Sequence, residues 1–288
     1  MAGPDQIDLL HRGVPKSVSC FLLDTDDGPA LCDCGPESTI DALKAGLAER
    51  GLKVTDLRHL LLSHIHLDHG GAAGALAREH PALQVHVSEV GAPHLAEPER
   101  LERSARRLYG DTFDALWGGL APVPKENIRV AGDKVAGLEC FPTPGHATHH
   151  ISYLDRDGTL YTGDAAGVRI EPGSFVMPPT PPPDIDIAVW EHTFDEIERR
   201  NPERLALVHF GVFDDPVSHL ARLRLELLDW AEFVRGGASE DEFLEYCRTE
   251  LSDAGEPVGT MDNAMPFWQS YRGLKRWADQ QSGLSQAS

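Results

Sequence analysis

Ser63-His64-Ile65-His66-Leu67-Asp68-His69-Gly70-Gly71 is the stretch that decides how this chain of 288 residues folds. It places four side chains able to bind a metal within six residues, namely His64, His66, Asp68 and His69. Imidazole and carboxylate groups together suit a Lewis-acidic divalent ion such as zinc, iron or manganese. Packing alone does not account for this density of donors, so the stretch predicts a metal site.

The backbone around these donors indicates how they are presented. An apolar run at residues 57–62 is typical of a buried strand, and it ends directly at the histidine-rich segment. In an extended segment alternate residues point the same way, so His64 and His66 can grip one ion together. Asp68 and His69 follow where the chain turns into a helix, and their donors can face a second ion.

One short segment cannot complete two coordination spheres, so donors from distant parts of the chain are required. Three candidates stand at the ends of predicted strands. His146 follows Thr-Pro-Gly, Asp164 follows Thr-Gly, and His209 follows the apolar run at residues 205–208. Strand ends are rigid positions with open loops, which makes them suitable for functional groups.

Short apolar strands alternate with amphipathic helices through most of the chain. Strands are predicted at residues 18–23, 30–33, 84–87, 139–141, 151–154 and 159–162, and helices at residues 39–50 and 72–80. We expect Ser38 to cap the first helix and Gly51 to end it. Two similar halves, each with donors at strand ends, predict two stacked sheets with helices outside.

Three further segments are distinct in composition. Residues 97–120 are helical and charged, and we interpret them as an insertion or lid over the sheet. The proline-rich run 178–183 must be an extended, stiff loop, which either walls a pocket or merely connects elements at the surface. Residues 216–288 are predicted to be helical, which divides the chain into a catalytic domain (1–215) and a helical cap or subdomain (216–288).

The sequence resembles the metallo-β-lactamase-fold hydrolase superfamily over about residues 14–211. The resemblance lies in four motifs that occur in the family's order: the four-donor motif, Thr-Pro-Gly-His, Gly-Asp and the late strand-end histidine. Within this superfamily, Thr-Pro-Gly-His146 followed by His150 is similar to the glyoxalase II-like group. The resemblance implies the α/β class (α+β), as an αββα sandwich with a C-terminal helical extension. It also implies a binuclear site, most commonly of zinc, with iron or manganese as alternatives.

The resemblance also implies the role of each donor. The first ion would be held by His64, His66 and His146, the second by Asp68, His69 and His209, and Asp164 would bridge the two. Asp33 falls where the family has a structural aspartate, and His150 is expected to hold a ligand in place by a hydrogen bond. Arg169 could meet a substrate carboxylate, with an ordinary salt bridge as the alternative.

The chemistry implied is hydrolysis of a small ester, thioester or lactone. Two ions roughly 3.5–4 Å apart turn a bridging water into hydroxide near neutral pH, and this hydroxide attacks a carbonyl carbon. Asp68 would be the catalytic residue that orients the hydroxide and carries a proton towards the leaving group. The segment around His209 lacks the Gly-His-Glu-Tyr-Thr of glutathione thioesterases, and no tyrosine closely follows Asp164 as in lactonases.

Other classes remain as alternatives. A sulfur dioxygenase-like oxidoreductase with one iron keeps much of the same motif but uses fewer ligands. A nuclease would need a basic surface, and a non-catalytic binding protein would usually have lost a ligand. The chain has neither feature, because all seven donors are present and its net charge is strongly negative.

The amino-acid composition limits the kinds of molecule that this chain is expected to bind. With 26 Lys and Arg against 46 Asp and Glu, the formal net charge is -20, which repels phosphate backbones and anionic lipid. We therefore expect a small-molecule substrate rather than nucleic acid or a membrane, and the composition leaves a homo-oligomer open. No export signal is apparent, and five cysteines, an odd number, suggest reduced thiols and a cytoplasmic protein.

Overall fold

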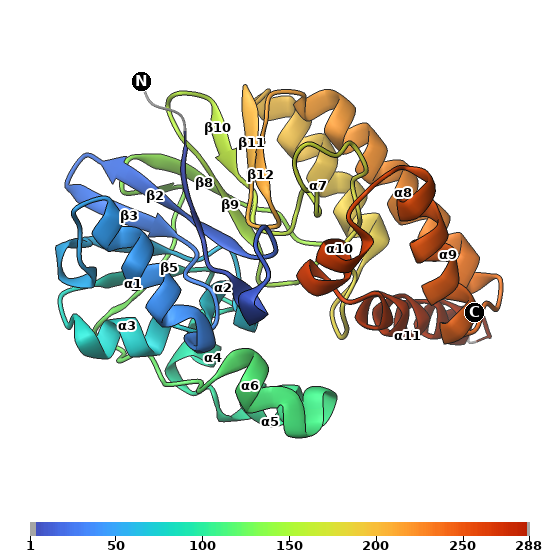
Figure 1. Cartoon of the computed structure of the whole chain (residues 1–288), viewed down its shortest axis with the longest axis horizontal. Helices are drawn as coiled ribbons and strands as arrows, with labels where there is room; N and C mark the ends of the chain where they lie inside the picture. The colour runs from blue at the N-terminus through green and yellow to red at the C-terminus, as the bar shows by residue number, and fades with distance from the viewer. Residues whose placement is uncertain (1–3, 287–288) are drawn as a thin grey trace.

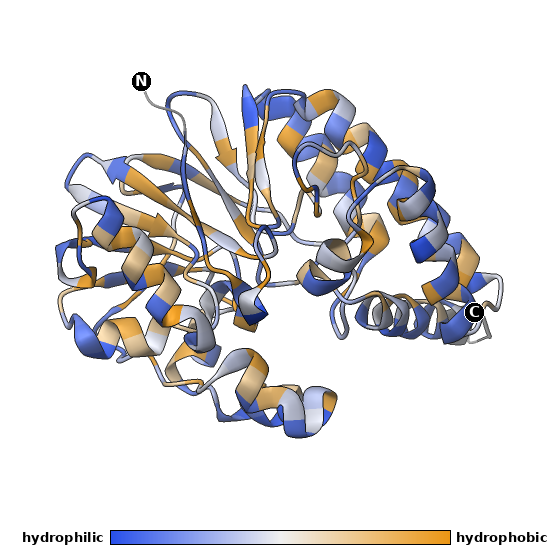
Figure 2. Cartoon of the chain, viewed as in Figure 1, coloured by the Kyte–Doolittle hydropathy of each residue, from blue (hydrophilic) through white to orange (hydrophobic). Residues whose placement is uncertain are grey.

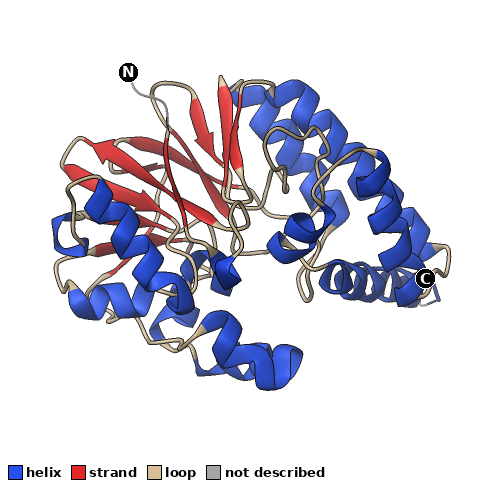
Figure 3. Ribbon diagram, in the orientation of Figure 1, coloured by secondary structure: helices blue, strands red, loops and turns tan. Residues whose placement is uncertain are grey.

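Two six-stranded sheets lie at the centre of the molecule, and helices cover their outer faces (Figures 1 and 3). The computed structural model describes residues 4–286. The first sheet has the order β1-β2-β3-β4-β5-β6 and the second has the order β12-β11-β10-β9-β8-β7. The predicted sandwich of two sheets with helices outside is confirmed.

The first sheet is antiparallel from β1 to β3 and parallel from β3 to β6. Its strands are β1 Asp5–Asp8, β2 Ser19–Thr25, β3 Gly28–Cys32, β4 His59–Leu61, β5 Gln84–Val87 and β6 Ile128–Val130. In the second sheet only β10 and β11 are parallel. Its strands are β7 Lys134–Val135, β8 Leu138–Pro142, β9 Ile151–Leu154, β10 Thr159–Tyr161, β11 Arg204–Leu207 and β12 Gly211–Phe213.

The helices fall into three groups along the chain. Those near the first sheet are α1 Ile40–Glu49, α2 Leu67–Gly70, α3 Ala73–Glu79 and α4 Ala92–Ala96. The charged segment forms α5 Glu99–Tyr109 and α6 Phe113–Trp117. The second half carries α7 Ile187–Arg200, α8 Pro216–Arg235, α9 Glu240–Asp253, α10 Val258–Ala264 and α11 Phe267–Gln286. Short 3-10 helices occur at His11–Gly13, Glu37–Thr39, Val54–Asp56 and Gly110–Thr112.

The alternation of strand side chains builds three layers of core. In β2, Cys20 packs with the helices of the first sheet, whereas Phe21 and Leu23 pack between the sheets with residues such as Tyr153 of β9. Successive strand side chains point to opposite faces, so each sheet is buried on both sides. Figure 2 shows this as hydrophobic residues gathered in the strands and hydrophilic ones on outer helix faces and turns.

The helices beyond residue 216 share their core with the second sheet. Leu223 of α8 lies in one buried apolar cluster with Phe194 of α7, Leu205 of β11 and Phe243 of α9. The division at residues 215 and 216 therefore stays a prediction. Within residues 4–286, no helix combines the length and the apolarity that crossing a bilayer would need.

Two details differ from the sequence interpretation. Ser38 does not cap α1, since its Oγ donates instead to the carbonyl of Leu116 (2.6 Å) and the chain enters α1 through the preceding 3-10 turn. The helix α7 was not expected, although Asp186 caps it by accepting a hydrogen bond from the amide of Val189 (3.1 Å).

Candidate metal centre

The seven predicted donors converge at one end of the sandwich. His64 and His66 follow β4, Asp68 and His69 lie in α2, His146 lies between β8 and β9, Asp164 follows β10, and His209 lies between β11 and β12. They form two groups, each with its ligand atoms within 4.8 Å of one another: His64, His66, His146 and Asp164, and then Asp68, His69 and His209.

Asp164 lies between the two groups. Its Oδ2 is 3.2 Å from Nε2 of His146 and 4.0 Å from Nε2 of His64. Its Oδ1 is 3.1 Å from Nε2 of His69 and 3.5 Å from Nε2 of His209. One carboxylate oxygen thus faces each group, which is the arrangement expected of a bridging ligand.

Five of the inward-facing donor atoms have no hydrogen-bond partner, whereas Nε2 of His146 lies 2.9 Å from Nδ1 of His66. Nε2 of His64, His69 and His209 and both carboxylate oxygens of Asp164 are buried and make no hydrogen bond within the described part of the chain. Buried polar atoms without a partner are costly and rare in folded proteins. Because these atoms also point at one another, the residues fit a pair of divalent cations.

The opposite ring nitrogens are fixed by hydrogen bonds. Nδ1 of His146 donates to the carbonyl of Pro179 (2.8 Å), and Nδ1 of His209 donates to the carbonyl of Ser17 (2.6 Å). A carbonyl only accepts, so the proton is on Nδ1 and the lone pair is on Nε2, facing the centre. Such outer hydrogen bonds orient metal-binding histidines.

Asp33 lies at the α2 end of the centre, near the site, where the sequence resemblance places it. It is fully buried in a left-handed backbone conformation (φ 59°). The amide and hydroxyl of Ser63 both donate to it (2.8 Å each), and its Oδ2 lies 2.9 Å from Nδ1 of His69. Asp33 therefore ties the strand end at Ser63 to the ring of His69.

His150 supports Asp164. The amide of Asp164 donates to Nε2 of His150 (3.1 Å), so Nδ1 of His150 carries the proton and donates to Oγ1 of Thr143 (2.8 Å). The expected hydrogen bond from His150 to the site is thus made to a ligand's backbone. His149 is also buried, and the centre of its ring lies 5.4 Å from that of His66.

Burial favours the neutral form of every histidine of the centre, but the carboxylates of Asp164 and Asp68 outweigh it at His69 and His209, whose pKa values are raised. Burial holds the pKa of His64 and His66 well below the usual value, so both imidazoles are neutral. Burial alone would raise the pKa of Asp164, but the neighbouring histidines His69, His146 and His209 outweigh it and lower this pKa well below its ordinary range. Asp164 is therefore ionised.

Solvent reaches the centre from one side. The side chains of His64, His69, His146, Asp164 and His209 are at most 1% exposed, whereas Asp68 is 14% exposed and His66 is half-buried. A substrate therefore has to approach at His66 and Asp68.

The 97–120 segment packs beside this open side. Leu67 shares an apolar cluster with Ala105, Phe113 and Trp117 of this segment. The hydroxyl of Tyr109 donates to Oε1 of Gln269 in α11 (3.1 Å). Burial, together with the negative charge of Asp68, raises the pKa of the Tyr109 phenol. The segment thus borders the centre, and its role as a lid stays a prediction.

The proline-rich loop is not a surface connector. Residues 177–181 are buried, and Oγ1 of Thr180 donates to the carbonyl of Ser270 in α11 (3.3 Å). Since Pro179 holds His146, the loop lies between a predicted ligand and the last helix. The surface interpretation fails because most of the loop is buried and the carbonyl of Pro179 is a hydrogen-bond partner of His146.

Arg169 lies outside the two groups. Its guanidinium pairs with Asp215 (2.7 Å) and lies 4.1 Å from the centre of the Phe213 ring, and the side chain is 12% exposed. Its backbone hydrogen-bonds to the carbonyl of His209 and the amide of Phe210. The guanidinium of Arg169 is thus engaged in the salt bridge that the sequence analysis gave as the alternative to substrate binding.

Comparison with known proteins supports the sequence resemblance. A family model described as the metallo-beta-lactamase superfamily matches residues 13–209. The metallo-beta-lactamase fold-containing protein ST1585 of Sulfurisphaera tokodaii is 29% identical over 179 residues, which cover 58% of this chain and 66% of that protein. An N-acyl homoserine lactonase of Bacillus cereus is 28% identical over 160 residues, covering 48% and 57%. The chain thus matches about three fifths of these relatives' length.

Solved structures share the fold. The crystal structure of ST1585 superposes with a TM-score of 0.63 at 21% identity, covering 90% of this chain and 93% of that one. The family protein TTHA1429 of Thermus thermophilus gives a TM-score of 0.64 at 21% identity, covering 92% and 89%. At this level of identity the likeness concerns the fold.

Proposed function

The chain belongs to the metallo-beta-lactamase superfamily, and from that premise we propose that it is a binuclear metal-dependent hydrolase acting on a small ester, thioester or lactone. The observation that carries the proposal is the pair of donor groups with Asp164 between them and unpartnered ligand atoms facing inward. Among the relatives, one is named an N-acyl homoserine lactonase and another an atrochrysone carboxyl ACP thioesterase, which supports lactone and thioester chemistry.

In this proposal His64, His66 and His146 would hold the first ion and Asp68, His69 and His209 the second, with Asp164 between the two groups available to both. Bound there, divalent ions would lower the pKa of water and polarise a substrate carbonyl. Zinc suits these nitrogen and oxygen donors, and iron or manganese are the alternatives. One structural relative, TTHA1623, is described in a di-iron-bound form (TM-score 0.54).

Asp68 is the residue proposed to act on the reacting groups. It is the more accessible carboxylate of the centre, and its Oδ2 lies 3.5 Å from Nε2 of His209. Burial would raise its pKa, but the charges of His69 and His209 lower it, so the carboxylate is ionised and accepts hydrogen bonds. It can therefore take up a proton from water and pass it to the leaving group.

The buried histidines have a second effect. With four of them fully buried, bulk water is kept from the inner face of the centre. Charges that develop there during reaction are less screened than in water, so fixed groups act on them more strongly.

The alternative of a mononuclear iron oxidoreductase is less well supported. It would use one donor group, whereas the ligand atoms of Asp68, His69 and His209 form a second group that is equally compact. Two ions require both groups, and this favours hydrolysis.

Metal content and substrate range test the proposal together. We expect elemental analysis of the purified protein to give two divalent ions per chain. We also expect hydrolysis of at least one member of an ester, thioester and lactone panel, lost on chelation and restored by metal. One iron per chain with oxygen uptake and no hydrolysis would support the oxidoreductase instead.

A further inference from the structure

We propose that one face of α11, formed by Trp268, Arg272 and Arg276, binds the part of the substrate remote from the reacting carbonyl, and that this part ends in an oxyanion. The proposal rests on the proposed hydrolase function and names the substrate class: an acyl compound with an apolar body and an anionic end. The site would extend the metal centre along α11.

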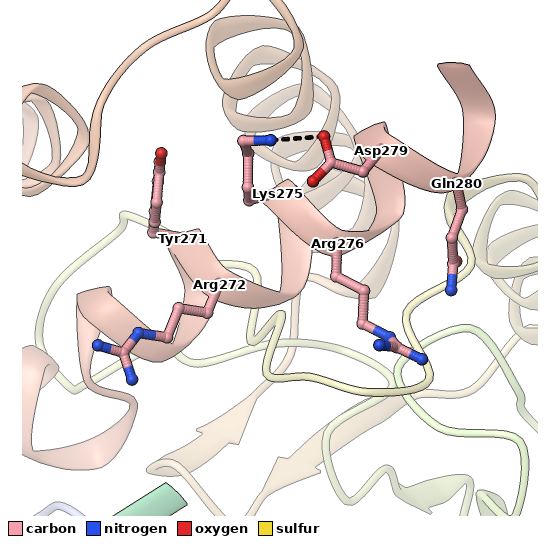
Figure 4. A pocket seen from close by; sticks show the side chains of 6 residues that line it. All are labelled: Tyr271, Arg272, Lys275, Arg276, Asp279 and Gln280. Atoms are coloured by element: carbon pink, nitrogen blue, oxygen red, sulfur yellow. Dashed lines mark hydrogen bonds and ion pairs between the residues drawn. The ribbon is translucent and has the colours of Figure 1, made fainter. Parts of the chain in front are cut away.

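The three residues share one helix face. They are spaced four apart, so their side chains follow each other along the helix. Arg272 and Arg276 line an open pocket of about 520 Å³, together with Tyr271, Lys275, Asp279 and Gln280. Figure 4 shows both guanidinium groups directed to the same side of α11, away from the ion pair of Lys275 and Asp279.

Arg276 has no carboxylate partner in the described part of the chain, and Arg272 has a single, solvent-exposed one. Within residues 4–286, no carboxylate lies within 4 Å of Arg276, whose Nε donates only to the carbonyl of Pro183 (3.2 Å). Arg272 lies 3.6 Å from a carboxylate oxygen of Glu240, and both side chains are more than a third exposed, so that pair is weak. The net charge of the chain is -20, so a pocket with two such guanidinium groups would favour anions over neutral ligands.

One end of this face reaches the open side of the metal centre. The ring of Trp268 meets that of Tyr109 edge-on, with centroids 6.1 Å apart. Tyr109 packs against the apolar cluster that contains Leu67, the residue before Asp68, and Asp68 is one of the two solvent-accessible donors. If the substrate extends from its carbonyl on the side of Asp68, the part next to the carbonyl would therefore contact aromatic rings.

The other end of the face reaches the loop that supports His146. Arg276 binds Pro183, and Pro179 of the same loop accepts the hydrogen bond of His146. Arg272 joins the two ends, because its guanidinium lies 4.7 Å from the centre of the Trp268 ring. Aromatic rings favour an apolar body, and the planar guanidinium pairs with carboxylate or phosphate oxygens.

Calorimetric titration of the metal-loaded protein with three matched probes tests this. The probes are 6-phenylhexanoate, 6-phenylhexyl phosphate and the neutral 6-phenylhexanamide. We expect the protein to bind an anion more tightly than the amide, and the tighter of the two anions identifies the oxyanion. Arg272→Gln and Arg276→Gln should each weaken anion binding about fivefold, the upper end for exposed charge pairs, and leave the amide unchanged.

Two variants serve as controls. Trp268→Leu should weaken all three probes, since they share the apolar body. Arg235→Gln, which removes the same charge from an exposed position at the end of α8, should alter none of them. Circular dichroism melts show whether each variant is folded.

Equal binding of the anions and the amide would overturn the inference, as would anion binding that the two arginine variants leave unchanged. The hydrolysis panel separates this from the proposed function. Absence of hydrolysis with the predicted binding pattern removes the hydrolase function and keeps the anion site. Hydrolysis without the binding pattern removes the anion site and keeps the hydrolase.

Discussion

At the scale of single residues, the two carboxylates of the centre differ in surroundings. Asp164 is buried among four histidines, whereas Asp68 borders solvent and contacts only the second group. Burial fits Asp164 to join ions, and accessibility fits Asp68 to exchange protons with water or substrate. Their chemical identity is the same, so position decides the role.

Asp68→Asn is the direct test of the proton-transfer role. The amide keeps the size and one oxygen of the carboxylate but cannot take up a proton, so we expect turnover to fall by roughly 10²–10⁴-fold. The melting temperature should stay close to that of the unmodified protein. Turnover within a factor of two, with two ions still bound, would contradict the role.

A histidine far from the centre predicts a pH effect on stability. Nε2 of His59 donates to Oδ1 of Asp27 (3.1 Å), so its Nδ1 accepts from Nε2 of His86 (3.0 Å). Burial, with smaller contributions from His59 and Arg129, lowers the pKa of His86 to about 4. The folded state keeps His86 neutral, whereas the unfolded state binds the proton near its ordinary pKa of 6.5.

The unfolded state therefore binds more protons between about pH 6.5 and pH 4, and stability falls as the pH falls through this window. Thermal melts over pH 4 to 8 measure the effect. In His86→Gln, part of this decline should be absent, because the titrating group has been removed. Identical pH profiles for the two proteins would show that His86 does not contribute.

At the scale of elements, the last helix and the proline-rich loop form one support for His146. A Cβ added to Gly273 of α11 would meet the carbonyl oxygen of Thr180 at 1.9 Å, which is a backbone clash. The helix and the loop are therefore packed as closely as glycine allows. A shift of the loop would also move Pro179, whose carbonyl accepts the hydrogen bond of His146.

Gly273→Ala should for this reason both destabilise the protein and weaken metal binding. Overpacking of this kind costs about 1–3 kcal/mol of unfolding free energy. Gly283→Ala in the same helix, where an added Cβ meets nothing within 4 Å, should be neutral or slightly stabilising. Denaturant unfolding and metal titration measure both effects, and equal behaviour of the two variants would contradict the proposed support.

The element scale also shows what the sequence could predict. Strands at residues 84–87 and 151–154 were predicted correctly, because apolar runs are local signals. The seven residues proposed as donors also lie together, although their role as ligands stays a prediction. Strands of two or three residues, such as β7 and β12, are too short for an alternation pattern. Backbone carbonyls such as those of Ser17 and Pro179 have no signature in sequence, so the partners of His209 and His146 could not be predicted.

At the scale of the whole molecule, the metal centre joins the two sheets. The segment after β4 of the first sheet, which includes α2, and the loops after β8, β10 and β11 of the second supply its donors. A ligand that binds only the folded state stabilises it by about 4 kcal/mol at a thousand times its dissociation constant. Ions at this junction should therefore stabilise the sandwich as a whole.

Removing metal should lower the melting temperature by roughly 10 °C, because each kcal/mol corresponds to a few degrees for a chain of this size. Calorimetric melts before and after dialysis against a chelator measure the shift, and adding zinc back is the control. An unchanged melting temperature, with metal loss verified, would show that the centre does not tie the sheets together.

Two ions that share Asp164 are the central feature of the proposed centre, and anomalous X-ray diffraction at the absorption edge of the bound metal detects them directly. We predict two peaks, one among His64, His66 and His146 and one among Asp68, His69 and His209, with a carboxylate oxygen of Asp164 facing each. A single peak, or none, in crystals of metal-loaded protein that hydrolyses its substrate would contradict it.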